Sequence, residues 1–283
     1  MTETIKLVRH VARPDAIAAA DSAATELEKL GLRIVEEECQ TDVDLVLAFG
    51  GDGTILSAAD WARTHDAPLL GVNTGHMGFL AETNVDGIGG LVQKIANHDY
   101  RVDTRMTLDV EMRFPDGTVT RDWALNEAVV SHTDPAHPVH LVLTVDGQDV
   151  STYGADGIIL ATPTGSTAYN FSAGGPVVWP DTEAIIMSPL AAHGLFTRTL
   201  VLSTSSLLEV VVLEEQWTAP EVWCDGQRRT TTPGGTSIRA TKGERSLRLV
   251  RLDDTPFSSR LVHKFKLPTR GWREGEQGAP AQS

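Results

Sequence analysis

Short apolar runs alternate with helical periodicity over the first hundred residues. Strands are predicted at 5–10, 32–35, 45–49 and 68–72, and helices at 15–30 and 55–65. The run 45–49 has no polar position, which is typical of a parallel strand that is buried on both faces. This alternation predicts a doubly wound, Rossmann-like α/β domain over residues 1–99.

The pattern changes near residue 100. Short runs of β-branched and apolar residues now follow one another, and turn signals such as Asp146-Gly147 and Asp225-Gly226 separate them. The fold class predicted is therefore α/β plus all-β, with a β-sandwich-like second domain over 100–255. The segment 256–270 is expected to rejoin the first domain, and 271–283 to form a loose tail.

Two glycine-rich turns follow neighbouring apolar runs of the first domain. Gly50-Gly-Asp-Gly53 comes directly after 45–49, and 73–80 (Asn-Thr-Gly-His-Met-Gly-Phe-Leu) comes after 68–72. Ligands of open α/β sheets bind at the carboxyl ends of the strands, so one shared crevice is expected there. Asp52 is the carboxylate of the first turn, and Thr54 is a candidate cap for the helix that follows.

Charge and composition exclude several classes of function. The 283 residues carry a net charge of −14 with a pI near 5.0, which argues against nucleic acid or an anionic membrane as the main partner. No apolar run approaches the roughly 20 residues of a membrane span. The polar N-terminus is not expected to be a signal peptide. Cys39 and Cys224 lie far apart, as expected for ordinary thiols in a reducing cytoplasm.

The distribution of basic residues limits how the protein could handle phosphate. No lysine or arginine occurs from 45 to 62 or between Asp122 and Thr197, and the Walker pattern G-x-x-x-x-G-K-[ST] is absent. Backbone N–H groups and a divalent cation would have to balance the charge of a phosphate near these stretches.

The stretch 161–176 combines small hydroxyl residues and glycines with Tyr169 and Asn170. Such a loop can approach a ligand closely and offer neutral hydrogen bonds together with a stacking face. Taken alone, the composition fits an ordinary surface loop equally well.

Four motifs together resemble the NAD kinases, over roughly residues 5 to 265. They are 50–54 (GGDGT), 73–80 (NTGHMGFL), Asn126-Glu127, and 162–169 (TPTGSTAY) with 172–176 (SAGGP). The GGDG turn is shared with lipid kinases and relatives of phosphofructokinase. The TPTGSTAY segment and the Asn-Glu pair make the resemblance specific to the NAD kinases.

The resemblance implies transfer of a phosphoryl group from ATP, or from polyphosphate, to the 2′-hydroxyl of the adenosine ribose of NAD. Asp52 is then the catalytic residue that orients this hydroxyl and accepts its proton. With a normal pKa near 4 it would be a weak base that takes the proton late. No protein-built metal site is expected, because Mg²⁺ or another divalent cation would arrive with ATP. The other residues that the resemblance assigns to ligand binding are Gly53, Thr74, Phe79, Asn126, Glu127, Asp156, Thr167, Ala168, Tyr169, Asn170, Phe171, Ser172 and Gln227.

Two positions depart from the family pattern. Many relatives carry a basic residue where this chain has Ser57, and another near the start of strand 139–145, where this chain offers His137 or His140. These departures leave the phosphate contacts and the donor open. His132 and Asp134 lie near these histidines, but the spacing favours an exposed loop over a structural zinc site.

The resemblance further implies a cytoplasmic homodimer or homotetramer. Two alternatives remain from the sequence. One is a lipid or sugar kinase of the GGDG group, which leaves the Asn-Glu pair and the TPTGSTAY loop without an explanation. The other is a non-catalytic dinucleotide-binding sensor on the same fold, against which the presence of Asp52 argues.

Overall fold

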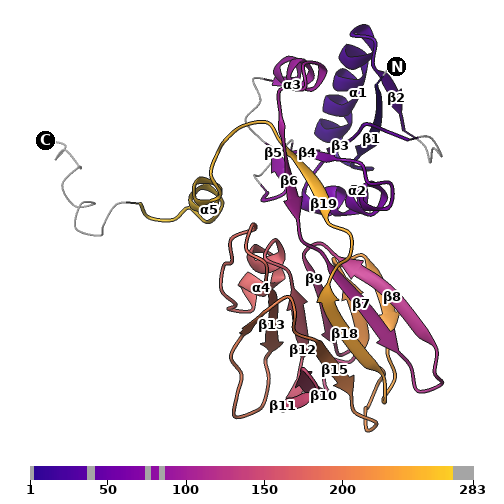
Figure 1. Cartoon of the computed structure of the whole chain (residues 1–283), viewed down its shortest axis with the longest axis vertical. Coiled ribbons are helices and arrows are strands. Elements are labelled where there is room, and N and C mark those ends of the chain that lie inside the picture. Colours follow the sequence, from indigo (N-terminus) through magenta and orange to yellow (C-terminus); the bar gives the residue numbers. More distant parts are fainter. Residues whose placement is uncertain (1–2, 37–41, 74–77, 83–86, 270–283) are drawn as a thin grey trace, which may run out of the picture. The chain divides into compact units, whose positions relative to one another are not determined.

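The computed structural model describes residues 3–36, 42–73, 78–82 and 87–269 (Figure 1). The chain divides into two compact units. Unit 1 comprises Met1–Ile55, Leu70–Arg101 and Val250–Ser283, and unit 2 comprises Leu56–Leu69 and Val102–Leu249. The expected tail 271–283 lies outside the described residues.

The elements at the start of the chain form an α/β arrangement, as the alternating pattern predicts. They are β1 (Thr4–Arg9), α1 (Pro14–Lys29), β2 (Arg33–Val35), β3 (Leu45–Phe49), α2 (Asp52–Thr64), β4 (Leu69–Val72), β5 (Ala81–Glu82), α3 (Gly87–Ala96) and β6 (Arg101–Arg105). The sheet has the order β2-β1-β3-β4-β19-β6, with β5 beside β4 and with β19 (Leu247–Arg251) entering from the far end of the chain. β1 runs parallel to both β2 and β3.

Helix α1 shows how its sequence fits this sheet. Ala16, Ala20, Ala23 and Leu27 recur at helical spacing and are all buried. The helix is followed by Gly31, whose φ of 87° is the left-handed conformation that glycine adopts readily after a helix. Strand β3 is buried at all five positions, as expected for a central strand that is covered on both faces.

Helix α2 differs from its prediction in where it begins and in the unit to which most of it belongs. It begins at Asp52 rather than at 55, so Thr54 lies inside the first turn and is not the cap. Its later residues, from Leu56 onward, group with unit 2 instead of the first domain. Within unit 2, Asp60 accepts a hydrogen bond from the Trp123 indole at 2.9 Å, and Arg63 donates to Asp109 at 2.9 Å.

Unit 2 is a sandwich of two six-stranded sheets, in agreement with the fold class expected from sequence (Figure 1). The first sheet has the order β11-β10-β15-β18-β7-β8 and the second the order β14-β13-β12-β9-β16-β17. Strands of the first sheet are β7 (Leu108–Arg113), β8 (Val119–Ala124), β10 (Val139–Val145), β11 (Gln148–Ala155), β15 (Leu208–Val212) and β18 (Ser237–Lys242). Strands of the second are β9 (Glu127–Ser131), β12 (Gly157–Ala161), β13 (Ile185–Leu190), β14 (Leu200–Leu202), β16 (Glu221–Cys224) and β17 (Arg228–Thr231).

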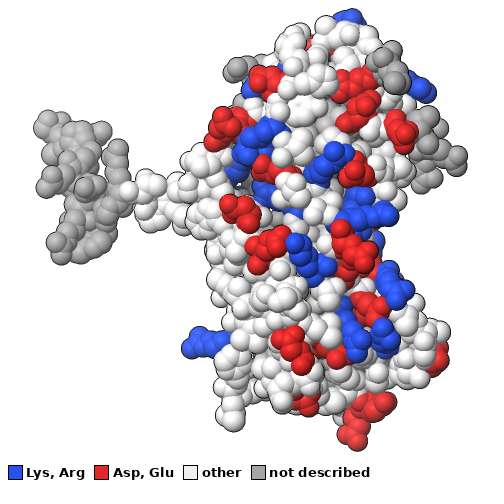
Figure 2. Space-filling view, viewed as in Figure 1, with Lys and Arg blue, Asp and Glu red and all other residues white. Residues whose placement is uncertain are grey.

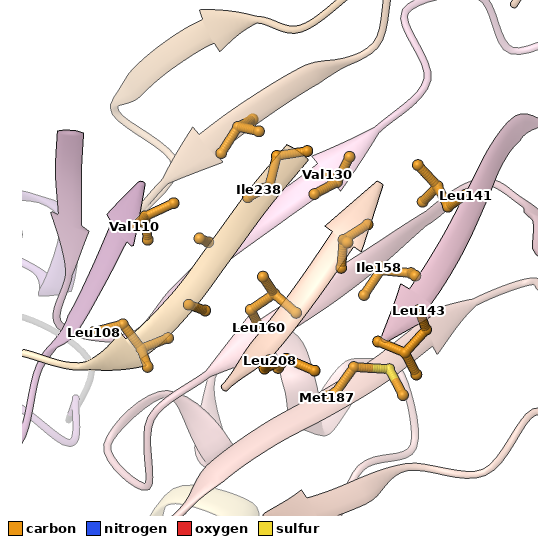
Figure 3. Packing of buried hydrophobic residues seen from close by; sticks show 14 of the residues in the cluster. Leu108, Val110, Val130, Leu141, Leu143, Ile158, Leu160, Met187, Leu208 and Ile238 are labelled. Carbon is orange, nitrogen blue, oxygen red and sulfur yellow. The ribbon is translucent and has the colours of Figure 1, made fainter. Parts of the chain in front are cut away.

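Side chains from both sheets fill the sandwich (Figure 3). Leu108 and Ile238 come from the first sheet, and Val130 and Leu160 from the second, and all are buried. Alternate positions of β7, and of β10 as far as Leu143, are buried, which is the period of two that a half-covered strand requires. β12 is buried at every position, because Val178 and Ala173 of the following loop cover its outer face around Ile159.

Three short helical segments complete the described chain. They are the 3-10 turn η1 (Gly165–Thr167), α4 (Tyr169–Ser172) and the C-terminal α5 (Phe257–Phe265). The segment 256–270, which the sequence analysis expected to rejoin the first domain, contains α5 and groups with unit 1 as far as it is described.

Charged side chains of both signs are interspersed on the face seen in Figure 2. Ion pairs join many charged side chains of the described residues, as in Arg228 with Asp122 at 2.8 Å and Arg239 with Glu209 at 2.9 Å. Within the described ranges, none of the helices has the length and apolar character needed to cross a membrane.

Candidate active site

Asp52 occupies the point at which the buried strand β3 turns into α2. It is the first residue of the helix, where the N–H groups of the first turn and the helix dipole favour a negative charge. Its carboxylate accepts hydrogen bonds from the backbone N–H groups of Phe79 and Leu80, in the second glycine-rich turn. The two turns that the sequence analysis placed at one sheet edge therefore meet at this side chain.

A close approach of backbone makes this meeting possible. A Cβ atom at Gly78 would overlap the carboxylate of Asp52, so only glycine allows the second turn to lie this close. The other oxygen, Oδ1 of Asp52, is inaccessible to solvent and has no hydrogen-bond partner among the described residues. An unpartnered buried acceptor is costly, and a substrate hydroxyl is a group that could satisfy it.

The expected pKa of Asp52 needs correction. Burial of the carboxylate raises its pKa above the ordinary value, whereas the charge of Lys264 and the two N–H donors act in the opposite direction, and burial dominates. Asp52 is thus a stronger base than a carboxylate with a normal pKa near 4. The sequence could not reveal this, because burial of the carboxylate depends on how the fold packs other segments against it, and the backbone at Gly78 is one of them.

The remaining predicted residues of unit 1 have different positions. Gly53 is exposed in the first turn of α2. Phe79 packs against Phe257 and Phe265 of α5, with ring centroids 5.7 Å apart in each pair. Thr74 lies outside the described residues.

In unit 2, Asn126 and Glu127 lie where the chain crosses from β8 to β9. Asp225, in the turn between β16 and β17, accepts hydrogen bonds from the backbone N–H groups of Leu125 at 2.9 Å, Asn126 at 2.7 Å and Glu127 at 3.4 Å. Arg228 lies 3.6 Å from the same carboxylate. Asp225 therefore fixes the backbone of the Asn-Glu pair, a role that the sequence analysis did not assign to it.

Glu127 is a buried acid beside this negative charge. Burial, together with the charge of Asp225, raises the pKa of Glu127 to about 8, although the backbone N–H of Tyr169 acts in the opposite direction. Of the two carboxyl groups, Glu127 is the one that holds a proton at neutral pH. Three N–H donors and an arginine favour the charged form of Asp225 instead. Its buried Oε2 has no partner within the described chain, so it can donate to a ligand hydroxyl.

The loop after β12 is held against the Asn-Glu pair by its small residues. Thr162 donates from Oγ1 to the backbone oxygen of Leu125 at 2.5 Å, and its N–H donates to the backbone oxygen of Asn126 at 2.9 Å. A Cβ atom at Gly165 would overlap the backbone of Asn126. Taken alone, the composition of the loop fitted an ordinary surface loop. In the structure, its small residues allow the loop to pack closely against Asn126.

Asn170 is fully buried and supports this loop from within. Its Oδ1 accepts a hydrogen bond from Ser188 at 2.6 Å, and its Nδ2 donates to the backbone oxygen of Pro176 at 3.3 Å. Both ends of the carboxamide thus form hydrogen bonds inside the protein, where Asn170 supports the shape of the loop.

The other predicted residues of the loop are open to a ligand. Tyr169 is 47% exposed and Phe171 41% exposed, Ser172 is exposed, and Thr167 and Ala168 are half-buried. A cavity of about 240 Å³ is lined by Glu127, Val129, Ser131, Tyr169, Trp223 and Gly226. The sequence motifs point to Glu127 and Tyr169 but not to Trp223. The position of Trp223 just before Cys224-Asp-Gly-Gln227 is the signal that could have identified it.

Asp156 and Gln227 are exposed elsewhere in unit 2. Asp156 lies 3.8 Å from the ring of His132, and Gln227 accepts a hydrogen bond from Ser57 at 2.9 Å. Ser57, which stands where many relatives have a basic residue, thus joins α2 to the turn that carries Gln227.

The histidines near 137 and 140 have partners of their own. His137 hydrogen-bonds to Asp134 at 2.7 Å and stacks on Trp217 at 4.5 Å, whereas the ring of His140 lies beside Gly154. No group of three or more His, Cys, Asp or Glu side chains that could hold a metal ion occurs in the described part of the chain.

Comparisons with known proteins agree with the motifs. The family model described as the ATP-NAD kinase N-terminal domain matches residues 11–100, and that described as the ATP-NAD kinase C-terminal domain matches 125–252. NAD kinase 2 of Streptomyces coelicolor is 42% identical over 299 residues, which cover 98% of this chain and 97% of the relative.

Solved structures extend the agreement to the fold. Yeast NADH kinase, complexed with NADH, superposes with a TM-score of 0.86 at 20% identity, over 95% of this chain and 89% of the other. An NAD kinase from Archaeoglobus fulgidus, in complex with ATP, has a TM-score of 0.73 at 26% identity, over 95% and 100% of the two chains. The matched models, the near full-length relatives and the motif residues together show that this chain belongs to the ATP-NAD kinase family.

Proposed function

We propose that this protein phosphorylates NAD at the 2′-hydroxyl of its adenosine ribose, with ATP as the donor, and forms NADP. The observation that carries the proposal is the environment of Asp52. Its carboxylate is held by two backbone N–H donors, keeps one buried oxygen without a partner in the described chain, and has a pKa raised by burial. A general base is most effective when its pKa is close to the working pH.

In the reaction, the unpartnered oxygen of Asp52 accepts a hydrogen bond from the 2′-hydroxyl. The hydroxyl oxygen forms a bond to the γ-phosphorus, the bond from this phosphorus to the bridging oxygen breaks, and ADP leaves with the electron pair. The hydroxyl proton passes to Asp52. Because the transition state of phosphoryl transfer is loose, orientation contributes more than basicity, and the N–H donors of Phe79 and Leu80 supply that orientation.

Residues of unit 2 would hold the dinucleotide. The exposed ring of Tyr169 and the wall of Trp223 offer stacking faces, and the protonated Glu127 can donate to a ribose hydroxyl. Asn126, Thr167, Ala168, Phe171 and Ser172 would complete the adenosine side, and Asp156 the nicotinamide side. Gly53, Thr74 and Gln227 would provide further contacts to the ligands.

We propose that a divalent cation, Mg²⁺ in the simplest case, enters with ATP. When bound to the donor phosphates, it neutralises part of their charge. Polyphosphate remains the alternative donor, since Ser57 replaces a basic residue of many relatives.

We further propose a cytoplasmic homo-oligomer, either a dimer or a tetramer. Leu195, Phe196 and Val201 of unit 2 expose large apolar side chains around β14, and association would remove them from water. The free, buried thiol of Cys224 fits a reducing compartment.

A coupled assay for NADP formation tests the function. Purified protein is given Mg²⁺ and NAD, with ATP or polyphosphate as donor and with NADH as a parallel acceptor. NADP formed from ATP and NAD is the expected result. Dinucleotide binding without turnover under any combination would contradict the proposal and favour a dinucleotide sensor, and absence of binding would favour a lipid or sugar kinase.

A further inference from the structure

The C-terminal helix α5 carries basic residues toward the surroundings of Asp52, whose own stretch of sequence has none. No lysine or arginine occurs from 45 to 62, which includes the turn that carries Asp52. A donor with several phosphates brings a large negative charge to this place. A protein cation near Asp52 therefore has to come from a distant part of the chain.

Two aromatic rings hold α5 against the second glycine-rich turn. Phe257 from its first turn and Phe265 from its last both contact the ring of Phe79, with centroids 5.7 Å apart. The backbone N–H of Phe79 is one of the two donors to the Asp52 carboxylate. Since both ends of the helix contact Phe79, α5 lies along the segment that holds the catalytic carboxylate.

A buried ion pair fixes the rotation of the helix about its axis. Arg260 donates to Glu82 at 2.8 Å and to the backbone oxygen of Ala81 at 3.2 Å, and it is only 5% exposed. Arg251 binds the same Glu82 at 2.7 Å and the backbone oxygen of Phe79 at 3.2 Å. The face of α5 that carries Arg260 therefore points toward residues 79–82.

Lys264 follows Arg260 by four residues and so lies one turn further along the same face. It immediately precedes Phe265, whose ring touches Phe79. Its charge acts on Asp52 and lowers the pKa of that carboxyl against the effect of burial. Lys264 itself is exposed, so its ammonium group can reach a ligand.

We propose that Lys264 is the protein's cation for the transferred phosphoryl group and contacts the terminal phosphates of the donor beside Asp52. The inference rests on the proposed kinase reaction and adds a binding residue to it. As the bond between the γ-phosphorus and its bridging oxygen breaks, negative charge accumulates on the leaving phosphate. An ammonium group close to that oxygen stabilises the charge, and it takes no part in the covalent step.

The test compares Lys264→Gln with Lys266→Gln, an exposed lysine two residues further on that serves as the matched control. Lys264→Gln is expected to lower kcat/KM for ATP at least about tenfold, because one charge-assisted phosphate contact is lost. The Kd for NAD in the absence of ATP should stay within twofold of the parent protein. Lys266→Gln should match the parent in both quantities.

A pH profile separates this role from a structural one. Removal of Lys264 takes away a charge that lowers the pKa of Asp52, so the acidic limb of kcat should move to higher pH in Lys264→Gln. Lys264→Arg keeps the charge and should leave the acidic limb of the kcat profile at the same pH as in the parent protein. Equal kcat/KM values for the two glutamine variants, or a loss of NAD binding equal to the loss of activity, would overturn the inference. If the parent protein forms no NADP, the proposed function itself fails, which is a different result.

Discussion

Asp52 in unit 1 and Glu127 in unit 2 are both partly unsatisfied, buried carboxyl groups. Each keeps one buried oxygen without a hydrogen-bond partner in the described chain, and burial raises the pKa of each. Such groups weaken a folded protein unless a ligand completes their hydrogen bonds. At the scale of single residues, these two carboxyl groups therefore lower the stability of the folded protein, and a ligand that completes their hydrogen bonds would restore it.

Asp52→Asn should separate the effect of Asp52 on catalysis from its effect on stability. We expect kcat to fall about 100-fold or more, since the amide cannot accept the hydroxyl proton. The Kd for NAD should change little. The melting temperature at pH 7 should rise, because the folded-state pKa of Asp52 lies above its unfolded value and its ionisation therefore destabilises the fold. This gain should vanish below about pH 4, where the carboxyl is neutral in both states. Unchanged kcat would contradict the assigned role.

Glu127→Gln mimics the protonated acid and should reveal its titration. With a folded-state pKa of about 8 and an unfolded value near 4.5, wild-type Glu127 loses stability as pH rises between these values. The melting temperature of the variant relative to the parent should therefore climb from about pH 4.5 to about pH 8 and then level off. Differential scanning calorimetry across this range is the measurement. A difference that does not depend on pH would show that Glu127 is ionised in the folded protein.

At the scale of elements, two segments far from each other in sequence build the surroundings of Asp52. The turn 78–80 supplies the N–H donors, and α5, nearly two hundred residues later, packs on Phe79. The ion pairs of Glu82 with Arg251 and Arg260 hold these segments together. The surroundings of Asp52 in unit 1 therefore include the C-terminal helix.

Arg260→Met should weaken this connection. Loss of one partner of a buried ion pair costs about 3 kcal/mol or more in the free energy of unfolding, and here the loss includes the hydrogen bond to Ala81. We expect kcat to fall with stability, since α5 then no longer holds Phe79. Urea denaturation measures the first effect and the NADP assay the second. Arg260→Lys keeps the charge and should recover part of both, and a methionine variant of full stability would refute the role.

At the scale of the whole molecule, the two units contribute different chemistry. In the proposed reaction, unit 1 would supply the general base and its N–H donors, whereas unit 2 would supply stacking surfaces and the protonated acid around the cavity at Tyr169 and Trp223. The sandwich supports the residues of unit 2 that would bind a ligand. Its strand β12, which is buried at every position, leads directly into the loop at 162–176.

The proposed oligomer predicts a simple change in size. Leu195 is fully exposed and Phe196 is 40% exposed, between β13 and β14. Replacing both by serine should shift the protein toward smaller species, because the apolar area that drives association is removed. Sedimentation velocity at several concentrations measures this shift. Leu267→Ser, at an exposed leucine in unit 1, is the control and should leave the size unchanged. Identical sedimentation of all three proteins would place the interface elsewhere.

The sequence by itself determined the class of the fold and the identity of the central chemistry. The unbroken apolar run 45–49 predicted the central strand, and β3 has the same bounds. The change of periodicity near 100 predicted the sandwich, because side-chain alternation along a strand is a local property. The motifs that contain Asp52, Asn126-Glu127 and Tyr169 pointed to the family to which the chain belongs.

Only the tertiary structure decided how these residues behave. Desolvation and hydrogen bonding depend on groups brought from elsewhere in the chain, and local periodicity carries no information about them. For this reason the raised pKa values of Asp52 and Glu127, the support from Asp225 and the inward use of Asn170 were not foreseen. The same reason explains Lys264, which the fold brings to Asp52 from more than two hundred residues away.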